Sequence, residues 1–323
     1  MTGAGPGPGI VDAHHHVWDL SVRDQDWITG PELAPLRRGF ALTDLSPEAR
    51  AAGVTATVLV QTVTVPEETP ELLAMAAGCD LVAGVVGWTD LTAPDVADTL
   101  ARLRAGPGGE HLVGMRHQVQ GEPDPRWLLR PEALRGLAAV AEAGLVHDLV
   151  VKPHQLPAAT EAAQRLPALT FVLDHLGKPP IASGQLAPWA ERIRRLAALP
   201  NTVCKLSGMV TEADWHSWTV DDLRPYADTV LDAFGPGRLM FGSDWPVCRL
   251  VATYADVVAA ARAVTAGLSP AERRHVFTDT AVRIYGLPHT GPGVLATDTP
   301  CDSVRHSVRS QDGLRASIRK RAV

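Results

Sequence analysis

The chain has 323 residues, of which 46% are hydrophobic and 20% charged, so it is expected to fold around a sizeable core rather than to be disordered. Its net charge of −6 argues against general electrostatic binding to nucleic acid or to an anionic membrane. No apolar run is long enough for a transmembrane helix, and no secretory signal is visible, so we expect a cytoplasmic protein. The widely spaced cysteines, Cys79, Cys204, Cys248 and Cys301, are expected to be reduced thiols.

Short aliphatic or β-branched runs recur along the whole chain. The predicted strands are Ile10–His14, Thr57–Gln61, Leu81–Val86, Leu112–Arg116, Asp148–Lys152, Leu169–Asp174, Thr202–Leu206 and Arg238–Phe241. Most of them are continuously apolar, which is typical of parallel strands that are covered on both faces. The segments between them have helical periodicity, most clearly in Pro131–Ala143, Ala187–Leu199 and Asp221–Phe234.

These strand–helix units between Ile10 and Gly286 fit the length of a (β/α)8 barrel. An open doubly wound sheet is the alternative, but such a sheet usually has a glycine-rich phosphate turn after its first strand, where this chain has histidines. We therefore predict an α/β protein with one (β/α)8 TIM barrel over residues 10–287. Residues 1–9 and 288–323 are predicted to be disordered tails.

One connection is too long for a simple barrel loop. It runs from Val17 to Val54 and contains at most one predicted helix, Ser46–Ala52. A loop of this length after a barrel strand predicts a functional insertion near the active-site face.

Active sites of such barrels lie at the carboxyl ends of the strands, and histidines and one late aspartate fall there. His14 and His16 are two residues apart, which places both side chains on one face of a strand. They predict a shared divalent ion, with His154 and Asp244 completing the ligand set. Imidazole and carboxylate ligands suit zinc, and suit manganese or iron less specifically. The alternative is that these histidines only form structural hydrogen bonds.

Asp244 follows a glycine and a serine at the end of the last strand, and we predict that it activates a water molecule and later returns the proton. His175 is predicted to orient that water or to stabilise a developing oxyanion, which makes both residues catalytic. Asp174 either fixes the tautomer of His175 or is only its structural neighbour.

Cations and tryptophans flank the same strand ends. Arg116 and Lys152 are predicted to bind an anionic or polyhydroxy substrate, and the alternative for each is an ion pair with a barrel carboxylate. Trp18 and Trp245 are predicted to stack on a sugar-like ring, although ordinary packing explains either one equally well.

The segments Ile10–Asp19, Lys152–Pro157, Asp174–Pro179 and Phe241–Pro246 resemble the amidohydrolase superfamily. More narrowly, they are similar to its amidohydrolase-related branch, which holds sugar-acid lactonases of the fuconolactonase and rhamnonolactonase type and other lactone hydrolases. The resemblance spans about residues 10–287 and implies a metal-dependent-hydrolase-like barrel.

By this resemblance, His14, His16, His154 and Asp244 occupy metal- or water-binding positions, and Arg116 tends to face the substrate. Superfamily members with two metals usually carry a bridging lysine where Arg116 stands, so a binuclear centre is not expected. The resemblance implies one divalent ion, with zinc preferred, or catalysis without a metal. Thr280 replaces the asparagine that the family usually has near the end of the barrel.

The sequence therefore predicts a hydrolase that opens a small lactone, of the sugar-acid or muconolactone type, by attack of water on the ring carbonyl. A non-oxidative decarboxylase acting on an aromatic or dicarboxylate substrate is the first alternative, and a non-catalytic ligand-binding barrel is the second. The expected partner is a small-molecule substrate, and the expected state is a monomer or homodimer.

Overall fold

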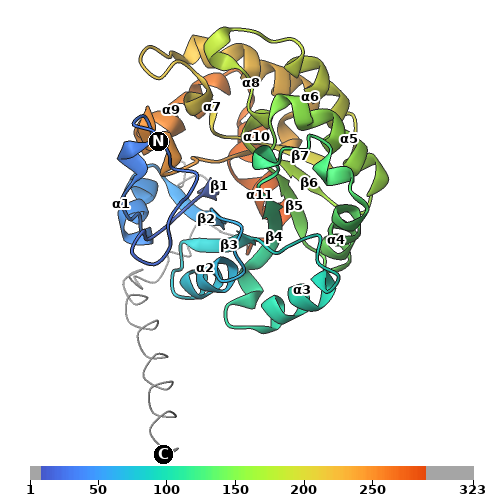
Figure 1. Cartoon of the computed structure of the whole chain (residues 1–323). Coiled ribbons are helices and arrows are strands. Elements are labelled where there is room, and N and C mark those ends of the chain that lie inside the picture. The colour runs from blue at the N-terminus through green and yellow to red at the C-terminus, as the bar shows by residue number, and fades with distance from the viewer. Residues whose placement is uncertain (1–8, 289–323) are drawn as a thin grey trace, which may run out of the picture.

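The computed structural model describes residues 9–288, and in it eight parallel strands pair in chain order from β1 to β8 (Figure 1). The strands are β1 (Ile10–His15), β2 (Val54–Val60), β3 (Val82–Gly87), β4 (Leu112–His117), β5 (Val146–Leu149), β6 (Phe171–Leu173), β7 (Thr202–Leu206) and β8 (Leu239–Phe241). The sheet closes where the His16 N–H donates to the Trp245 carbonyl at 2.7 Å and the Asp244 N–H donates to the His14 carbonyl at 2.8 Å. The predicted (β/α)8 barrel is confirmed.

Helices surround the strands in Figure 1. They are α1 (Leu42–Ala51), α2 (Glu68–Ala77), α3 (Val96–Ala105), α4 (Pro131–Glu142), α5 (Leu156–Arg165), α6 (Trp189–Ala197), α7 (Met209–Glu212), α8 (Val220–Phe234), α9 (Tyr254–Val264), α10 (Pro270–Arg274) and α11 (Thr280–Tyr285). Each of the three clearest helix predictions corresponds to one of these, namely α4, α6 and α8.

Several element boundaries differ from the prediction by a few residues, and two of these differences have a clear local cause or affect the site. Helix α1 begins at Leu42, four residues before the predicted start, because the Asp44 carboxylate accepts the Ala41 N–H at 2.8 Å and caps the helix there. Strand β5 ends at Leu149 rather than Lys152. The chain leaves the sheet at that point, and the Val150 carbonyl accepts a hydrogen bond from the Gln120 N–H at 3.0 Å.

The core has two parts, one inside the barrel and one between the strands and the helices. The interior part is built mainly from small aliphatic side chains on alternate strand positions and is completed by residues of α11 and its exit: Val11, Ala13, Ala56, Val58, Val60, Val86, Val146, Val172, Val203, Met240, Ala281, Tyr285 and Leu287.

Cys204 and Cys248 are buried and free, as expected, but Cys79 is disulfide-bonded, so the expectation of reduced thiols is wrong for that residue.

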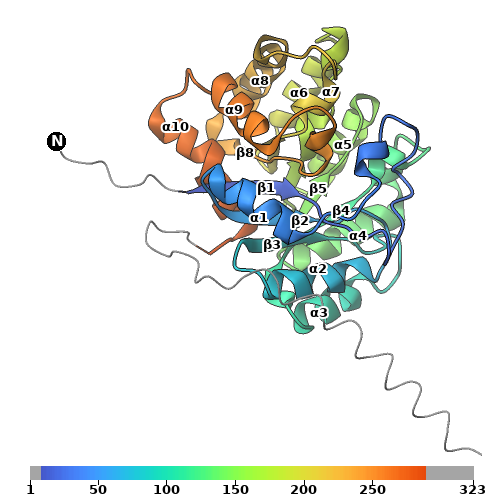
Figure 2. The same cartoon turned by 90° about the vertical axis from the view of Figure 1, so that its left-hand side faces the viewer.

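The connection between β1 and α1 lies at the end of the barrel toward which the strands run (Figure 2). This is the position predicted for a functional insertion. It is fastened to α2 by a two-pronged ion pair between Arg23 and Glu71, with N–O distances of 2.9 and 3.0 Å. The tails were predicted at residues 1–9 and 288–323, and all of these residues except Gly9 and Pro288 lie outside the described part of the chain. Among the described helices none is long and apolar enough to cross a bilayer.

Candidate active site

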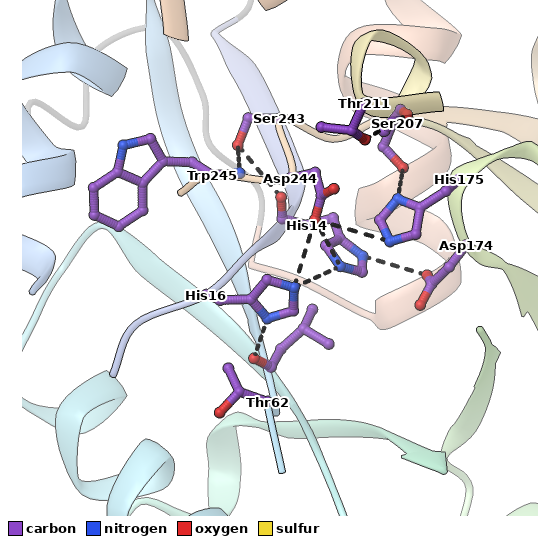
Figure 3. A network of polar contacts seen from close by, with 12 residues as sticks. His14, His16, Thr62, Asp174, His175, Ser207, Thr211, Ser243, Asp244 and Trp245 are labelled. Atoms are coloured by element: carbon purple, nitrogen blue, oxygen red, sulfur yellow. Dashed lines mark hydrogen bonds and ion pairs between the residues drawn. The ribbon is translucent and has the colours of Figure 1, made fainter. Parts of the chain in front are cut away.

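Three imidazoles meet around one carboxylate oxygen of Asp244 at the carboxyl end of the barrel (Figure 3). Oδ1 of Asp244 lies 3.6 Å from Nε2 of His16, 3.8 Å from Nε2 of His14 and 3.9 Å from Nε2 of His175. All four residues are buried, with exposed fractions of 6% or less. The ends of β1, β6 and β8 therefore bring together four of the residues that the sequence singled out.

The turn after β8 aims Asp244 at the histidines. A Cβ on Gly242 would lie 2.8 Å from the Cβ of His14, so only glycine allows this close approach. Asp244 has a φ of 57°, in the left-handed region, which costs a non-glycine residue about 1–3 kcal/mol and must be held by its surroundings. Part of that support comes from Asp12, whose carboxylate accepts hydrogen bonds from the N–H of Ser243 at 2.8 Å and from its hydroxyl at 2.6 Å.

The protonation of His16 follows from its partner. Its Nδ1 lies 2.8 Å from the Val60 carbonyl oxygen, which can only accept a hydrogen bond. Nδ1 of His16 therefore carries a proton, and in the neutral imidazole Nε2 has a lone pair that faces the site. Nε2 of His14 lies 3.1 Å from that lone pair.

His175 stands on a strained turn after β6, with a φ of 51°. Its Nδ1 is 3.0 Å from the Ser207 hydroxyl, which comes from the end of β7. A Cβ on Gly208 would lie only 2.7 Å from the same Nδ1, so the β7 exit also needs a glycine. Burial lowers the pKa of His175 to about 4, although the charge of Asp244 opposes this shift. The imidazole is therefore neutral at neutral pH.

Asp244 is ionised despite its burial. Removal from water raises the pKa of its carboxyl group, but the imidazoles of His175, His16 and His14 outweigh that effect and leave the pKa below its ordinary value. A buried carboxylate that stays charged and faces a group of imidazoles is suited to accept a proton or to bind a cation.

A layer of charged groups lies beneath these four residues, inside the barrel. Asp174 pairs with Arg116 at 3.0 Å and with Lys205 at 3.0 Å, and Lys205 also pairs with Asp148 at 2.5 Å. The hydroxyl of Tyr285, on α11, donates a hydrogen bond to the Asp148 carboxylate at 2.9 Å. Burial raises the pKa of Asp148 to about 6 even though Lys205 opposes the shift. For Asp174, burial also acts to raise the pKa, but Lys205, His14 and Arg116 together hold it well below the ordinary value.

Two overlapping groups of side chains have the geometry of a metal site. One is His14, His16 and Asp244; the other is His14, Asp174 and His175; within each, the ligand atoms lie within 4.8 Å of one another. The first group fits zinc better, because its donors are two imidazole nitrogens and one carboxylate, and the bond from His16 to Val60 leaves Nε2 free to bind. In the second group, Asp174 is already paired with two cations.

The structure does not bring His154 or Lys152 into this cluster. His154 lies in the 3-10 turn Pro153–Gln155 and is exposed, and neither metal group of the described residues includes it. Lys152 is exposed as well. The reason is that β5 ends at Leu149, so both residues lie beyond the strand end. His154 is therefore not part of the ligand set that we propose.

The other predicted substrate-binding residues are also used by the protein itself. Arg116 is 4% exposed, and its guanidinium binds Asp174 and the Gln61 carbonyl, which is the ion-pair alternative. Trp245 is 0% exposed, and Trp18 is 6% exposed with its indole N–H donating to the backbone of the insertion. Both indoles pack edge-on against Phe40, so neither has an open face for a sugar ring.

Sequence reasoning missed Lys205, Asp148 and Ser207 as members of the site. The signal for Lys205 and Asp148 was a charged residue within a strand, two positions after an interior valine in each case. Burying a charge is costly unless it is paired, so each of them predicted an opposite charge nearby.

Comparison with known proteins places these features in a family. The family model described as an amidohydrolase matches residues 11–287. An L-fucono-1,5-lactonase of Burkholderia multivorans is 42% identical over 289 residues, which covers 86% of this chain and 96% of that protein. An L-rhamnono-gamma-lactonase of Scheffersomyces stipitis is 26% identical over 162 residues, covering 44% of this chain and 48% of that protein. A solved amidohydrolase structure from Burkholderia multivorans with bound zinc matches with a TM-score of 0.82 at 40% identity, covering 86% of this chain and 99% of that chain.

Proposed function

Because the chain belongs to the amidohydrolase family, we propose that it hydrolyses a small lactone of the sugar-acid class to the open-chain acid. The observation that carries this proposal is the buried, ionised carboxylate of Asp244, which faces the Nε2 atoms of three histidines at 3.6–3.9 Å. The relatives named L-fucono-1,5-lactonase and L-rhamnono-gamma-lactonase support the substrate class.

Asp244 is the proposed general base and acid. Its carboxylate takes a proton from water while the water oxygen bonds to the ring carbonyl carbon. When the tetrahedral intermediate collapses, the bond from that carbon to the ring oxygen breaks, and Asp244 returns the proton to the departing oxygen. The carboxylate ends in the state in which it began.

His175 is the proposed donor to the developing oxyanion. It is neutral at neutral pH, and a hydroxyl proton of Ser207 donated to Nδ1 leaves the ring proton on Nε2. In that tautomer His175 presents an N–H toward the space beside Asp244. A donor that is already in place stabilises the oxyanion without reorganisation during the reaction.

His14, His16 and Asp244 would hold a divalent ion, for which we propose zinc, and the structure of the Burkholderia multivorans relative with bound zinc supports this choice. When bound, the ion would polarise the carbonyl group and increase the acidity of water. The chain's own part is to orient the His16 imidazole through the bond on its Nδ1 atom and to keep Asp244 charged.

The test is a pH-indicator assay of acid release from a panel of sugar-acid and muconolactone-type lactones, with and without chelator. We expect turnover by the wild type and a 10²- to 10⁴-fold lower kcat for Asp244→Asn, with roughly the wild-type unfolding transition. Asp228→Asn, which changes an exposed aspartate on α8, is the matched control and should stay within about twofold of the wild type.

Near-normal activity of Asp244→Asn would contradict the assignment of the base. Release of CO2 from aromatic or dicarboxylic acids, with no lactone opened, would replace the lactonase proposal by the decarboxylase alternative.

A further inference from the structure

We propose that Lys205 is a positioning residue that holds His14 in the tautomer with its proton on Nε2. Lys205 lies on β7 and is 0% exposed, in the charged layer beneath the site. The metal ligands and the acid–base residues proposed above do not include it. This inference rests on the proposed function in one respect, which is that His14 belongs to the active site.

The ammonium group of Lys205 makes two side-chain hydrogen bonds in the barrel interior, to Oδ2 of Asp148 at 2.5 Å and to Nδ1 of His14 at 3.0 Å. Oδ1 of Asp174 lies 3.0 Å from the same nitrogen as an ion-pair partner. An ammonium group can only donate, so Nδ1 of His14 must accept. The proton of a neutral His14 is then on Nε2.

The far side of His14 agrees with this assignment. Its Nε2 lies 3.1 Å from Nε2 of His16, which carries a lone pair because Nδ1 of His16 donates to the Val60 carbonyl. Donors and acceptors therefore alternate from Lys205 through His14 and His16 to the backbone of β2. Nη1 of Arg116 can also only donate, so its 3.4 Å contact with Nε2 of His14 is not a hydrogen bond in this tautomer. Nη1 makes its shorter contact, at 3.0 Å, with Asp174.

Asp174 is the competing partner of His14. Its Oδ1 lies 3.3 Å from Nδ1 of His14 and could accept a proton from that nitrogen. A histidine that binds a metal ion through Nε2 needs a lone pair there, so its proton must sit on Nδ1. For His14 to act as a ligand, the proton therefore moves from Nε2 to Nδ1, Nδ1 donates to Asp174, and Lys205 loses one hydrogen bond. His14 releases no proton in this exchange.

Lys205 and Asp174 thus favour different tautomers of His14. Lys205 favours a metal-free site in which His14 is a hydrogen-bond donor, and Asp174 favours a site in which His14 is a ligand. Lys205 therefore weakens the binding of a metal ion through Nε2 of His14.

The test measures the tautomer and the zinc affinity rather than turnover. Ring-nitrogen NMR of the metal-free wild type should show His14 protonated on Nε2. Lys205→Met/Asp148→Asn removes the lysine together with one partner carboxylate, and Asp148→Asn alone is the matched control that keeps the contact between Lys205 and His14. The double variant should show His14 protonated on Nδ1 and bind zinc about 10- to 100-fold more tightly than the control in a chelator competition.

Protonation of His14 on Nδ1 in the wild type would overturn the proposal, and this measurement needs no variant to fold. Equal zinc affinity in the control and the double variant would also overturn it. A lysine with only a structural role would change the unfolding temperature and leave the tautomer as it is. Because neither readout depends on a lactone, failure of the lactonase proposal would leave both results interpretable.

Discussion

Replacing Gly242 by alanine tests whether close packing of β8 against β1 sets the position of Asp244. The added Cβ would lie 2.8 Å from the Cβ of His14 and 3.2 Å from the Cβ of Ser207. Neither of these atoms is the end of a flexible side chain, so the backbone of the turn must shift. Carbon atoms in contact prefer about 3.5–4.0 Å, so the shift needed is roughly 1 Å.

Two effects of Gly242→Ala follow, with separate magnitudes. Overpacking a tight site costs roughly 1–3 kcal/mol of the free energy of unfolding. A displacement of about 1 Å in a reacting group costs on the order of 10²-fold in rate. Asp244 is two residues from the substitution and faces His14 directly, so we expect kcat to fall about 100-fold.

The assay compares kcat, KM and the urea unfolding midpoint of Gly242→Ala with those of Gly237→Ala. Gly237 lies just before β8, with nothing within 4 Å of an added Cβ. That control should keep wild-type kcat and, if anything, gain a few tenths of a kcal/mol because alanine restricts the unfolded chain (about 0.4–1 kcal/mol where the backbone allows it). Wild-type kcat and stability in Gly242→Ala would refute the argument that this contact positions Asp244.

Three further predictions concern neighbouring groups. Ser207→Ala removes the partner of His175 Nδ1, worth about 1 kcal/mol, so kcat should fall roughly five- to tenfold with little change in KM; an unchanged kcat would show that Ser207 does not orient the ring. Burial lowers the pKa values of His15 and His147 to about 3, below the 6.5 of an unfolded chain, so the unfolded state binds more protons between these pH values. The free energy of unfolding should therefore fall as the pH drops from 6.5 toward 4, and urea midpoints measure this fall. An equal pH dependence of the midpoint in His147→Leu would exclude a contribution from His147. Zinc at 100 times its Kd should stabilise the wild type by about 2.7 kcal/mol in thermal unfolding, and His16→Gln should lose most of that gain; equal stabilisation of both would remove His16 from the ligand set.

The residue pattern along the chain is sufficient to predict the barrel and the residues at the centre of the candidate site. Continuous apolar strands alternating with amphipathic helices leave few architectures, and a parallel barrel places every strand end on one face. The residue pattern therefore predicts that His14, His16, His175 and Asp244 lie together, because strand-end positions and the two-residue spacing at the end of β1 fix where such side chains project.

The further residues of the site depend on how strands that are distant in the chain come together. A shift of three residues in the end of β5 left His154 and Lys152 exposed, and element boundaries of that size are not encoded in an apolar pattern. The pairing of Lys205 with Asp148 and Asp174 depends on three strands meeting inside a closed barrel, which no local pattern specifies. A local pattern reports the face on which a side chain lies, whereas its partners are set by the register and closure of strands that are far apart in the chain.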